Sequence, residues 1–279
     1  MLFCVRASAS SSRDDLFVGG QKMLIDTHCH VDPGYFPEGV DAVLGRARAV
    51  GVGAFIVIGV GEDLGPARFA VDLASRLSDV WSVVGVHPHD AVALDDAMET
   101  EIERMAGGPR VCAIGEIGLD YHYMRSPRST QQDVFRRLIA LAVRVGKPIV
   151  VHTREAPEDT LSILEEEGAS RVGGVIHCFS EDKPFAERAL TLGFDISFSG
   201  IVTFKNARAI HEVAVWAPMD RILVETDSPY LAPMPMRGKR CEPAYVVHTA
   251  RRVAELRGDD FDTFVARTGE NARRRFRLA

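Results

Sequence analysis

From residue 23 onward the chain repeats one pattern, in which a short apolar run rich in β-branched residues precedes a longer amphipathic stretch. Runs such as AFIVIGV (54–60) and PIVVH (148–152) lack alternation, which is typical of parallel strands buried on both faces. Between the runs lie helical patterns, for example 131–145, with apolar residues on one stripe. The pattern predicts strands over 23–30, 54–60, 81–87, 111–118, 148–153, 174–179, 194–200 and 222–227.

The number and spacing of these runs indicate the fold. Each run with the stretch that follows it spans roughly 30 residues, the length of one strand–helix unit. Eight such units predict a single-domain α/β protein of the TIM (β/α)8 barrel class, which needs about 250 residues. The chain has 279 residues. An open sheet that binds a dinucleotide is disfavoured, because no G-x-G-x-x-G follows the first predicted strand.

The first 22 residues differ from the rest of the chain. They are rich in serine, and their longest apolar run, 2–5, is too short for a secretory signal. We expect residues 1–22 to be a disordered N-terminal extension, or an over-extended start that precedes the true initiator Met23. The barrel domain is expected over 23–279.

Composition and charge exclude some classes of protein. No apolar run approaches the roughly 20 residues of a membrane helix, so no membrane attachment is expected. The net charge of −6 gives no global positive field for a nucleic-acid duplex, and a nuclease would depend on local contacts and metal ions. Five cysteines without a C-x-x-C pair favour reduced thiols and a cytoplasmic location.

Polar residues occur where five of the predicted strands end. In such a barrel the C-terminal strand ends meet on the active-site face. One histidine or carboxylate there is usually a core or helix-capping residue, but six on one rim would be poorly partnered without a cation. In His28-x-His30, a period of two also puts both imidazoles on one side of a strand. We therefore predict a metal site formed by His28, His30, Glu116, His152, His177 and Asp227.

Two ions fit this set of ligands better than one. Six ligands exceed the three protein ligands typical of a catalytic zinc site with an open position. Glu116, on the central strand, can bridge two ions about 3.5–4 Å apart, an arrangement used in phosphoryl transfer. Four imidazoles favour zinc, manganese or iron over magnesium, which prefers oxygen ligands. Cys29 and Cys178 neighbour two ligands, and strand alternation predicts that their thiols point away from the ions.

A series of polar and glycine-containing motifs follows the predicted strands along the chain. They are LIDTHCHVD (24–32), GVHPH (85–89), GEIGLDYH (115–122), the pair Gln131–Gln132, VHTREA (151–156), HCFS (177–180), SFSGIVTFK (197–205), ETDSPYLAP (225–233) and RGKRCEPAYV (237–246). In this order the motifs resemble those of the TatD-related deoxyribonucleases, a branch of the amidohydrolase-like metal-dependent hydrolases. The resemblance runs from residue 24 to about 276.

The resemblance implies a TIM barrel that cleaves DNA from the 3′ end with divalent metal, usually Mg²⁺. By motif, one ion would be held by His28, His30, Glu116 and Asp227, and the second by Glu116, His152 and His177. The residues around the substrate would be His87, His89, Asp120, Arg154 and Arg240. The chain departs from the family pattern at Glu181, where glycine is usual, and at Cys241, where asparagine is usual. Neither is a metal ligand, so these departures bear on the grip of the substrate.

The predicted reaction is attack of a metal-activated water on a phosphodiester, with catalysis by Asp227 and Glu116. Asp227 would bind metal and accept a proton from the water, while Glu225 could orient the water. The expected partner is DNA, as single strands or 3′ ends, and no obligate protein partner is evident. Hydrolysis of an amide or ester, such as a D-aminoacyl-tRNA linkage, is the main alternative, because the same ligands would serve it. A scaffold without catalysis would lack a ligand, and none is missing.

Overall fold

The computed structural model describes residues 23–278, which form one parallel sheet of eight strands in the order β1 to β8. The prediction of an α/β TIM barrel is confirmed. Every predicted strand is present, and most end earlier than the apolar pattern indicates. The strands are Leu24–Cys29 (β1), Val52–Gly59 (β2), Val80–Val84 (β3), Val111–Asp120 (β4), Ile149–Arg154 (β5), Gly174–Ile176 (β6), Phe194–Phe198 (β7) and Ile222–Val224 (β8).

Backbone contacts between β1 and the chain after β8 close the sheet into a barrel. Cys29 forms a parallel bridge with Ser228. The N–H of Asp227 donates to the carbonyl of His28 at 2.9 Å, and the N–H of His30 donates to the carbonyl of Ser228 at 2.8 Å. The closure therefore brings His28 and His30 beside Asp227, although about two hundred positions separate them in the sequence.

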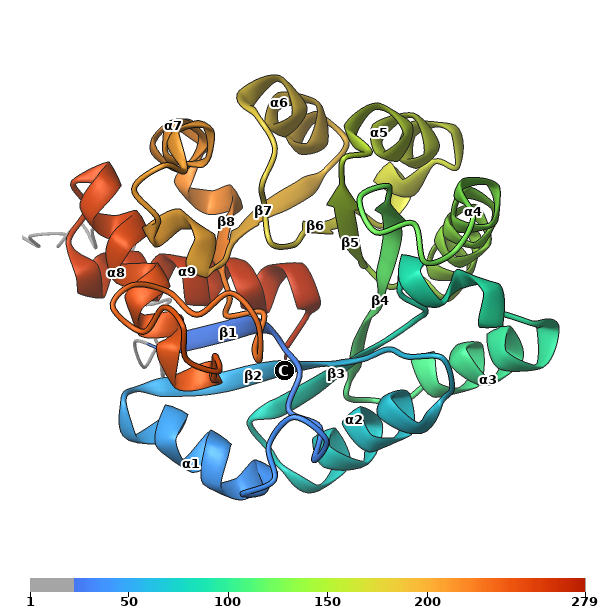
Figure 1. Cartoon of the computed structure of the whole chain (residues 1–279), viewed down its shortest axis with the longest axis horizontal. Helices are drawn as coiled ribbons and strands as arrows, with labels where there is room; N and C mark the ends of the chain where they lie inside the picture. Colours follow the sequence, from blue (N-terminus) through green and yellow to red (C-terminus); the bar gives the residue numbers. More distant parts are fainter. Residues whose placement is uncertain (1–22, 279) are drawn as a thin grey trace, which may run out of the picture.

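Helices surround the strands in chain order (Figure 1). The helix predicted over 131–145 begins at Arg128, directly after Pro127, and ends at Val145 before Gly146, which adopts the left-handed conformation (φ 68°). The helices are Val40–Ala49 (α1), Gly65–Arg76 (α2), Asp96–Ala106 (α3), Arg128–Val145 (α4), Pro157–Glu166 (α5), Lys183–Thr191 (α6), Arg208–Trp216 (α7), Val246–Arg257 (α8) and Phe261–Phe276 (α9).

Two apolar clusters fill the molecule, one on each side of the strands. The larger cluster lies between the outer face of the barrel and the surrounding helices. The smaller one contains alternate strand residues such as Val150 and Val175, together with Ala272 and Phe276 of α9. Two positions further along β5 a side chain faces the same side as Val150, so His152 lies above this inner cluster. The inner core thus forms the floor beneath the predicted site.

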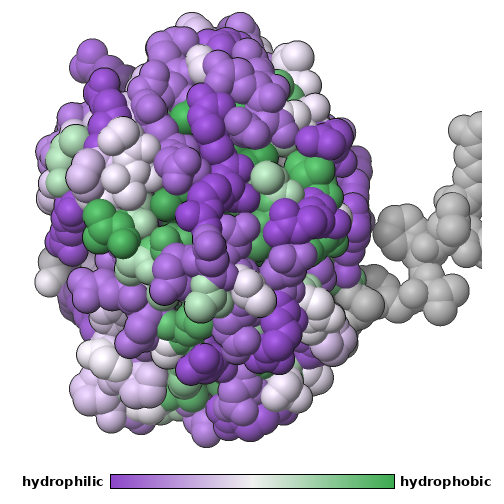
Figure 2. Space-filling view, turned by 90° about the vertical axis from the view of Figure 1, so that its right-hand side faces the viewer, coloured by the Kyte–Doolittle hydropathy of each residue, from purple (hydrophilic) through white to green (hydrophobic). Residues whose placement is uncertain are grey.

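The outer surface is rich in charge. Figure 2 shows a mainly hydrophilic surface, with small hydrophobic patches, on the side of the molecule that lies to the right in Figure 1. Within residues 23–278 no helix has both the length and the apolar character needed to cross a membrane. The predicted N-terminal extension, 1–22, lies outside the described residues.

Candidate metal centre

Glu116 of β4 lies at the centre of a cluster of imidazoles. Its Oε1 atom is 2.8 Å from His177 Nε2, 3.0 Å from His152 Nδ1 and 3.3 Å from His87 Nε2. The carboxylate and these rings are mostly or fully buried. Three strand ends, those of β3, β5 and β6, therefore direct an imidazole at one oxygen atom.

The other oxygen of the same carboxylate faces β1. Glu116 Oε2 lies 3.4 Å from His28 Nε2 and 3.8 Å from His30 Nε2. Asp227 approaches the same two rings from the far side, with its Oδ1 3.6 Å from His28 Nε2 and 3.8 Å from His30 Nε2. The six predicted ligands thus meet at Glu116, with His28, His30 and Asp227 on one side of its carboxylate and His152 and His177 on the other.

The ligand atoms form groups in which every atom lies within 4.8 Å of the others. One group is His28, His30 and Glu116, a second is His87, Glu116 and His152, and a third is His28, His177 and Glu225. The first two groups share Glu116, so a bridging carboxylate between two cations would fit their geometry. His87 was expected to contact substrate, yet it lies as near to Glu116 as the predicted ligands. Its place just after β3 was the available signal, since it follows the same rule of strand ends.

The buried ring nitrogens of His28 show whether a divalent cation fits the candidate site. Both of its ring nitrogens are buried, and neither has a hydrogen-bond partner among the described residues. A buried polar atom without a partner costs about 1–3 kcal/mol. A divalent cation at Nε2 would satisfy that atom, and imidazole with carboxylate is a normal ligand set for such ions. The donor set therefore fits a divalent metal.

The imidazoles of the cluster fall into two electrostatic groups, because contacts with carboxylates raise the pKa values of His152 and His177 in spite of their burial, whereas those of His30 and His87 are lowered. Burial lowers the pKa of His30 to about 3 and that of His87 to about 4, so both rings are neutral near pH 7 and keep a lone pair for a metal. Burial by itself would raise the pKa of Glu116, but His177 and His87 hold it well below its usual range. Burial raises the pKa of Asp227 to about 6.

A second layer of side chains fixes the ring of His152. Asp120 Oδ2 lies 3.1 Å from His152 Nε2 and 3.0 Å from His89 Nε2. Asp120 Oδ1 accepts the N–H of Tyr123 at 2.8 Å, and the backbone N–H of Asp120 donates to Gln131 Oε1 at 2.8 Å. A carboxylate behind a metal-ligating imidazole sets the orientation and basicity of the ring. Asp120 and His89 were both expected to contact substrate. In the structure Asp120 lies between the rings of His152 and His89 and contacts both.

Glu225 occupies a different place from the one expected. β8 ends at Val224 and Asp227 has a positive φ of 56°, so strand alternation does not relate the two carboxylates. Glu225 Oε1 accepts the N–H of Cys178 at 2.7 Å and lies 3.3 Å from His177 Nδ1, while Oε2 accepts from Ser197 Oγ at 2.5 Å. Both oxygens are thus hydrogen-bonded within the protein, and Oε1 is the one that holds His177.

Sequence reasoning gave no role to Asp26, which ties β1 to the segment that carries Asp227. Its carboxyl group accepts the N–H of Thr226 at 2.9 Å and the hydroxyl of Thr226 at 2.6 Å. Burial raises the pKa of Asp26 to about 8. The acidic residue of the DTHCH segment was the signal for this contact, because a buried carboxyl group in a strand requires a partner.

The two predicted rim arginines are both in contact with aromatic rings. The guanidinium of Arg154 lies 4.7 Å from the ring centre of Tyr123. Arg240 lies over the ring of Phe36 and donates to Glu38 and to the carbonyl of Tyr35, at 2.5 and 2.7 Å. Arg154 is exposed and forms no ion pair with a carboxylate of the described residues. Arg240, in contrast, joins the last loop to the segment after β1.

The structure shows the surroundings of the cysteines beside the predicted ligands and of the two residues that depart from the family pattern. The prediction for Cys29 is confirmed, because its thiol belongs to the outer apolar cluster. β6 ends before Cys178, so alternation does not apply there, and its Sγ lies 3.2 Å from Ser199 Oγ. Cys241 is buried and its N–H donates to the carbonyl of Pro229 at 3.0 Å, which supports the last loop. Glu181, the other departure from the family pattern, is partly buried, and this burial raises the pKa of its carboxyl group.

Comparison with known proteins identifies the family. The family model described as TatD related DNase matches residues 25–277. The chain belongs to this family. As a TatD-family protein it is a metal-dependent hydrolase, and its His/Glu clusters are consistent with a binuclear metal site. It is 41% identical over 256 residues to YabD, an uncharacterized metal-dependent hydrolase of Bacillus subtilis, a match covering 92% of this chain and 100% of YabD.

Two further TatD-family proteins extend the comparison. The chain is 36% identical over 249 residues to a protein of Erwinia tasmaniensis described as the 3'-5' ssDNA/RNA exonuclease TatD, covering 87% of this chain and 95% of that one. Among solved structures, the TatD homologue YJJV from Escherichia coli K12 has a TM-score of 0.85 and 28% identity, over 92% of this chain and 98% of its own. The family model and this solved structure therefore both match almost all of the described residues.

Proposed function

We propose that this protein is a metal-dependent deoxyribonuclease that hydrolyses phosphodiester bonds from the 3′ end of single-stranded DNA. One observation carries the proposal: a buried carboxylate, Glu116, faces imidazoles from two directions and links two groups of metal-ligating atoms. Bound there, two divalent ions would lower the pKa of water and offset negative charge on a scissile phosphate. The exonuclease of Erwinia tasmaniensis, 36% identical, supports a nucleic-acid substrate.

The residues of the chain then have distinct tasks. His28, His30 and Asp227 would hold one ion and His152 and His177 the second, with Glu116 between them. The pKa of Asp227, which burial raises to about 6, is close to neutral pH and suits a group that accepts a proton from water. The carboxyl group of Asp227 also remains mostly ionised near pH 7, as a metal ligand must be.

Exposed aromatic side chains around the centre suit unpaired bases. Tyr35 and Tyr230 are exposed, their hydroxyls lie 3.0 Å apart, and both rings lie beside His30. Tyr123 is exposed on the other side, beside His89 and beneath Arg154. Aromatic rings stack on bases of any sequence, and arginine adds charge for the backbone. These rings favour a single strand over a duplex, whose bases are already stacked.

The test compares substrates directly. The protein is freed of metal with a chelator, and Mg²⁺, Mn²⁺ or Zn²⁺ is added before incubation with labelled single-stranded DNA, RNA and a D-aminoacyl-tRNA. We expect metal-dependent release of mononucleotides from the 3′ end of DNA. Release of the amino acid from D-aminoacyl-tRNA, with intact DNA under every metal, would show that the same centre hydrolyses an ester and that the proposal is wrong.

A further inference from the structure

A hollow on the C-terminal side of the barrel carries several positive charges outside the metal centre. It has a volume of about 770 Å³ and lies between the loop after β7, the loop after β8 and helix α8. Glu255 is the acidic residue among those that line it. The basic residues that line it, which we call the basic hollow, are Lys205, Arg237, His248, Arg251 and Arg252.

Lys205, Arg237 and Arg251 have no carboxylate partner among the described residues. Arg237 lies over the ring of Phe204 and Arg251 over the ring of Phe261, each 4.5 Å from the ring centre. Within residues 23–278, Arg252 is the member of the basic hollow that forms an ion pair, with Glu255 at 3.8 Å. Burial and the nearby Arg251 both lower the pKa of His248. The hollow is therefore a local region of positive potential in a chain of net charge −6.

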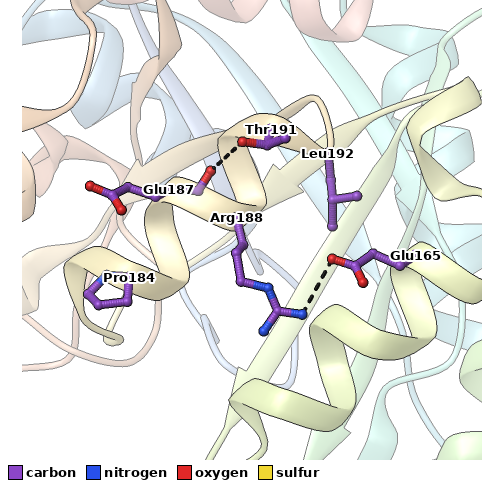
Figure 3. Close-up of a pocket in the computed structure, with 6 residues that line it drawn as sticks. All are labelled: Glu165, Pro184, Glu187, Arg188, Thr191 and Leu192. Atoms are coloured by element: carbon purple, nitrogen blue, oxygen red, sulfur yellow. Dashed lines mark hydrogen bonds and ion pairs between the residues drawn. The ribbon is translucent and has the colours of Figure 1, made fainter.

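A second surface hollow differs from the basic hollow in that its arginine is paired with carboxylates. It lies between α5 and α6, and Figure 3 shows Arg188 pointing across it to Glu165. Arg188 pairs with Glu165 at 3.3 Å and with Glu158 at 2.9 Å. Its charge is already matched, so this hollow has no excess charge for an anion. Uncompensated cations are thus a property of the basic hollow rather than of every depression on the surface.

The basic hollow belongs to the same loops as the metal centre. Asp227 and Tyr230 begin the loop after β8, and Met234 further along this loop lines the hollow. The N–H of Met234 donates to Thr203 Oγ1 at 2.8 Å, which joins the loops after β7 and β8. In TIM barrels the loops after the seventh and eighth strands are a frequent site for phosphate. A chain leaving the metal centre past Tyr230 would follow this loop to the hollow.

We propose that the basic hollow binds backbone phosphates of a single-stranded nucleic acid, on nucleotides 5′ of the bond that is cleaved. This inference rests on the proposed function. The basic hollow would supply the local positive contact that a nuclease of negative net charge needs. Several separated cations in a space of about 770 Å³ suit successive phosphates better than one small anion. The arginine over Phe204 adds a flat surface for a base.

The test removes the charge and varies the length of the substrate. The variant Lys205→Gln/Arg237→Gln/Arg251→Gln is compared with Arg104→Gln/Arg144→Gln/Arg188→Gln, which loses the same charge from exposed ion pairs on α3, α4 and α6. KM and kcat are measured on a dinucleotide and on a 12-nucleotide single strand, across a range of salt concentration. Lys205→Glu, at a loop position, repeats the measurement with less risk to folding.

The expected result is specific to the long substrate. The hollow variant should raise KM for the 12-nucleotide strand at least about tenfold and reduce the salt slope by about 2, since each single-strand phosphate contact contributes about 0.7. Cleavage of the dinucleotide and both activities of the control should stay unchanged. Lys205→Glu should raise KM for the long strand alone.

Other outcomes separate the two proposals. If the wild-type protein cleaves no nucleic acid with any metal, both the proposed function and the basic hollow fail. If the wild type cleaves DNA but the hollow variant matches the control in KM and salt slope, the hollow proposal alone is wrong. Binding of inorganic phosphate that the three substitutions abolish, without any change in KM for the long strand, would assign the hollow to a free anion and also overturn it.

Discussion

At the scale of single residues, the site depends on side chains that hold other side chains. Glu116 is ionised because His177 and His87 surround it, and His177 is held by Glu225. His152 is held by Asp120 in the same manner. Strand ends indicate the predicted ligands in the sequence, because a polar residue there breaks an apolar run. Asp120, the last residue of β4, and Glu225, directly after β8, give the same signal, so the sequence alone does not distinguish a ligand from a residue that holds one in place.

The role of Asp227 predicts a loss of activity without a loss of fold. Asp227→Asn removes the proton acceptor and a charged ligand while keeping the shape of the side chain. We expect kcat for single-stranded DNA to fall by about 10³–10⁴-fold with an unchanged circular dichroism spectrum. Asp220→Asn, in the 3₁₀ turn before β8, is the control and should leave kcat unchanged. Full activity of Asp227→Asn would exclude the assigned role.

The role of Asp120 predicts a weaker metal site rather than an abolished one. Asp120→Asn replaces the carboxylate behind His152 by a neutral group, and we expect affinity for one of two Mn²⁺ ions to fall by about 10–100-fold. Activity should return at high Mn²⁺ concentration, which a merely misfolded variant would not show. Asp159→Asn is the control, because Asp159 is bonded by Tyr121 and Gln132 instead of a histidine. Equal Mn²⁺ affinity in wild type and Asp120→Asn would contradict this account.

At the scale of elements, the contact between β4 and β5 determines where His152 lies. Gly118 has a φ of +144°, and a Cβ atom there would lie 1.9 Å from the carbonyl oxygen of His152. No side chain fits between the strands at this point. The glycine of the GLD segment therefore allows the close approach that directs His152 at Glu116.

Because β4 and β5 lie so close at Gly118, we expect a side chain at this position to destabilise the barrel and to displace His152. Gly118→Ala should lower the free energy of unfolding by at least about 2 kcal/mol, since both the backbone conformation and the contact with β5 oppose the methyl group. Gly146→Ala is the control: Gly146 also has a positive φ, but nothing lies within 4 Å of its Cβ position. Gly146→Ala should lower the free energy of unfolding by about 1 kcal/mol. Chemical denaturation measures both, and equal losses would disprove the role of the close approach.

Apolar runs predicted the strands but not where they end. A strand buried on both faces has an unmistakable composition, which is why all eight were found. After β6 and β8 the backbone turns at Cys178 and Asp227, both with positive φ, and a period of two no longer applies. The six predicted ligands still lie together in the structure, because they need only lie near the strand ends. The partners of Glu225 and the orientation of Cys178 depend on the turns themselves and could not be predicted.

At the scale of the whole molecule, α9 joins the ends of the barrel at the face opposite the metal centre. Asp195 of β7 is buried and accepts two hydrogen bonds from Arg275 of α9, both at 2.8 Å, and one from Arg221 before β8. Ala272 and Phe276 of the same helix complete the inner core. The catalytic face can therefore consist of loops, because the fold is secured from the other end.

The carboxylate of Asp195 should thus contribute to stability and not to chemistry. Asp195→Asn leaves two partly buried arginines without their counterion, and we expect a loss of about 2–3 kcal/mol in the free energy of unfolding. Asp79→Asn, which removes the surface pair with Arg48, should cost less than about 1 kcal/mol. Denaturation by urea measures both values. A large loss of kcat in Asp195→Asn under conditions where it remains folded would contradict the separation of the two faces.

The central claim is that Glu116 joins two metal ions, and the metal content of the protein tests it most directly. The chain is loaded with Mn²⁺, dialysed and analysed by plasma mass spectrometry as wild type, His30→Ala and His152→Ala, with His211→Ala as a control outside the site. We predict two ions per chain for the wild type and the control. Each of the other two variants should hold one. A single ion in the wild type, or two ions in both His30→Ala and His152→Ala, would contradict the two-metal centre.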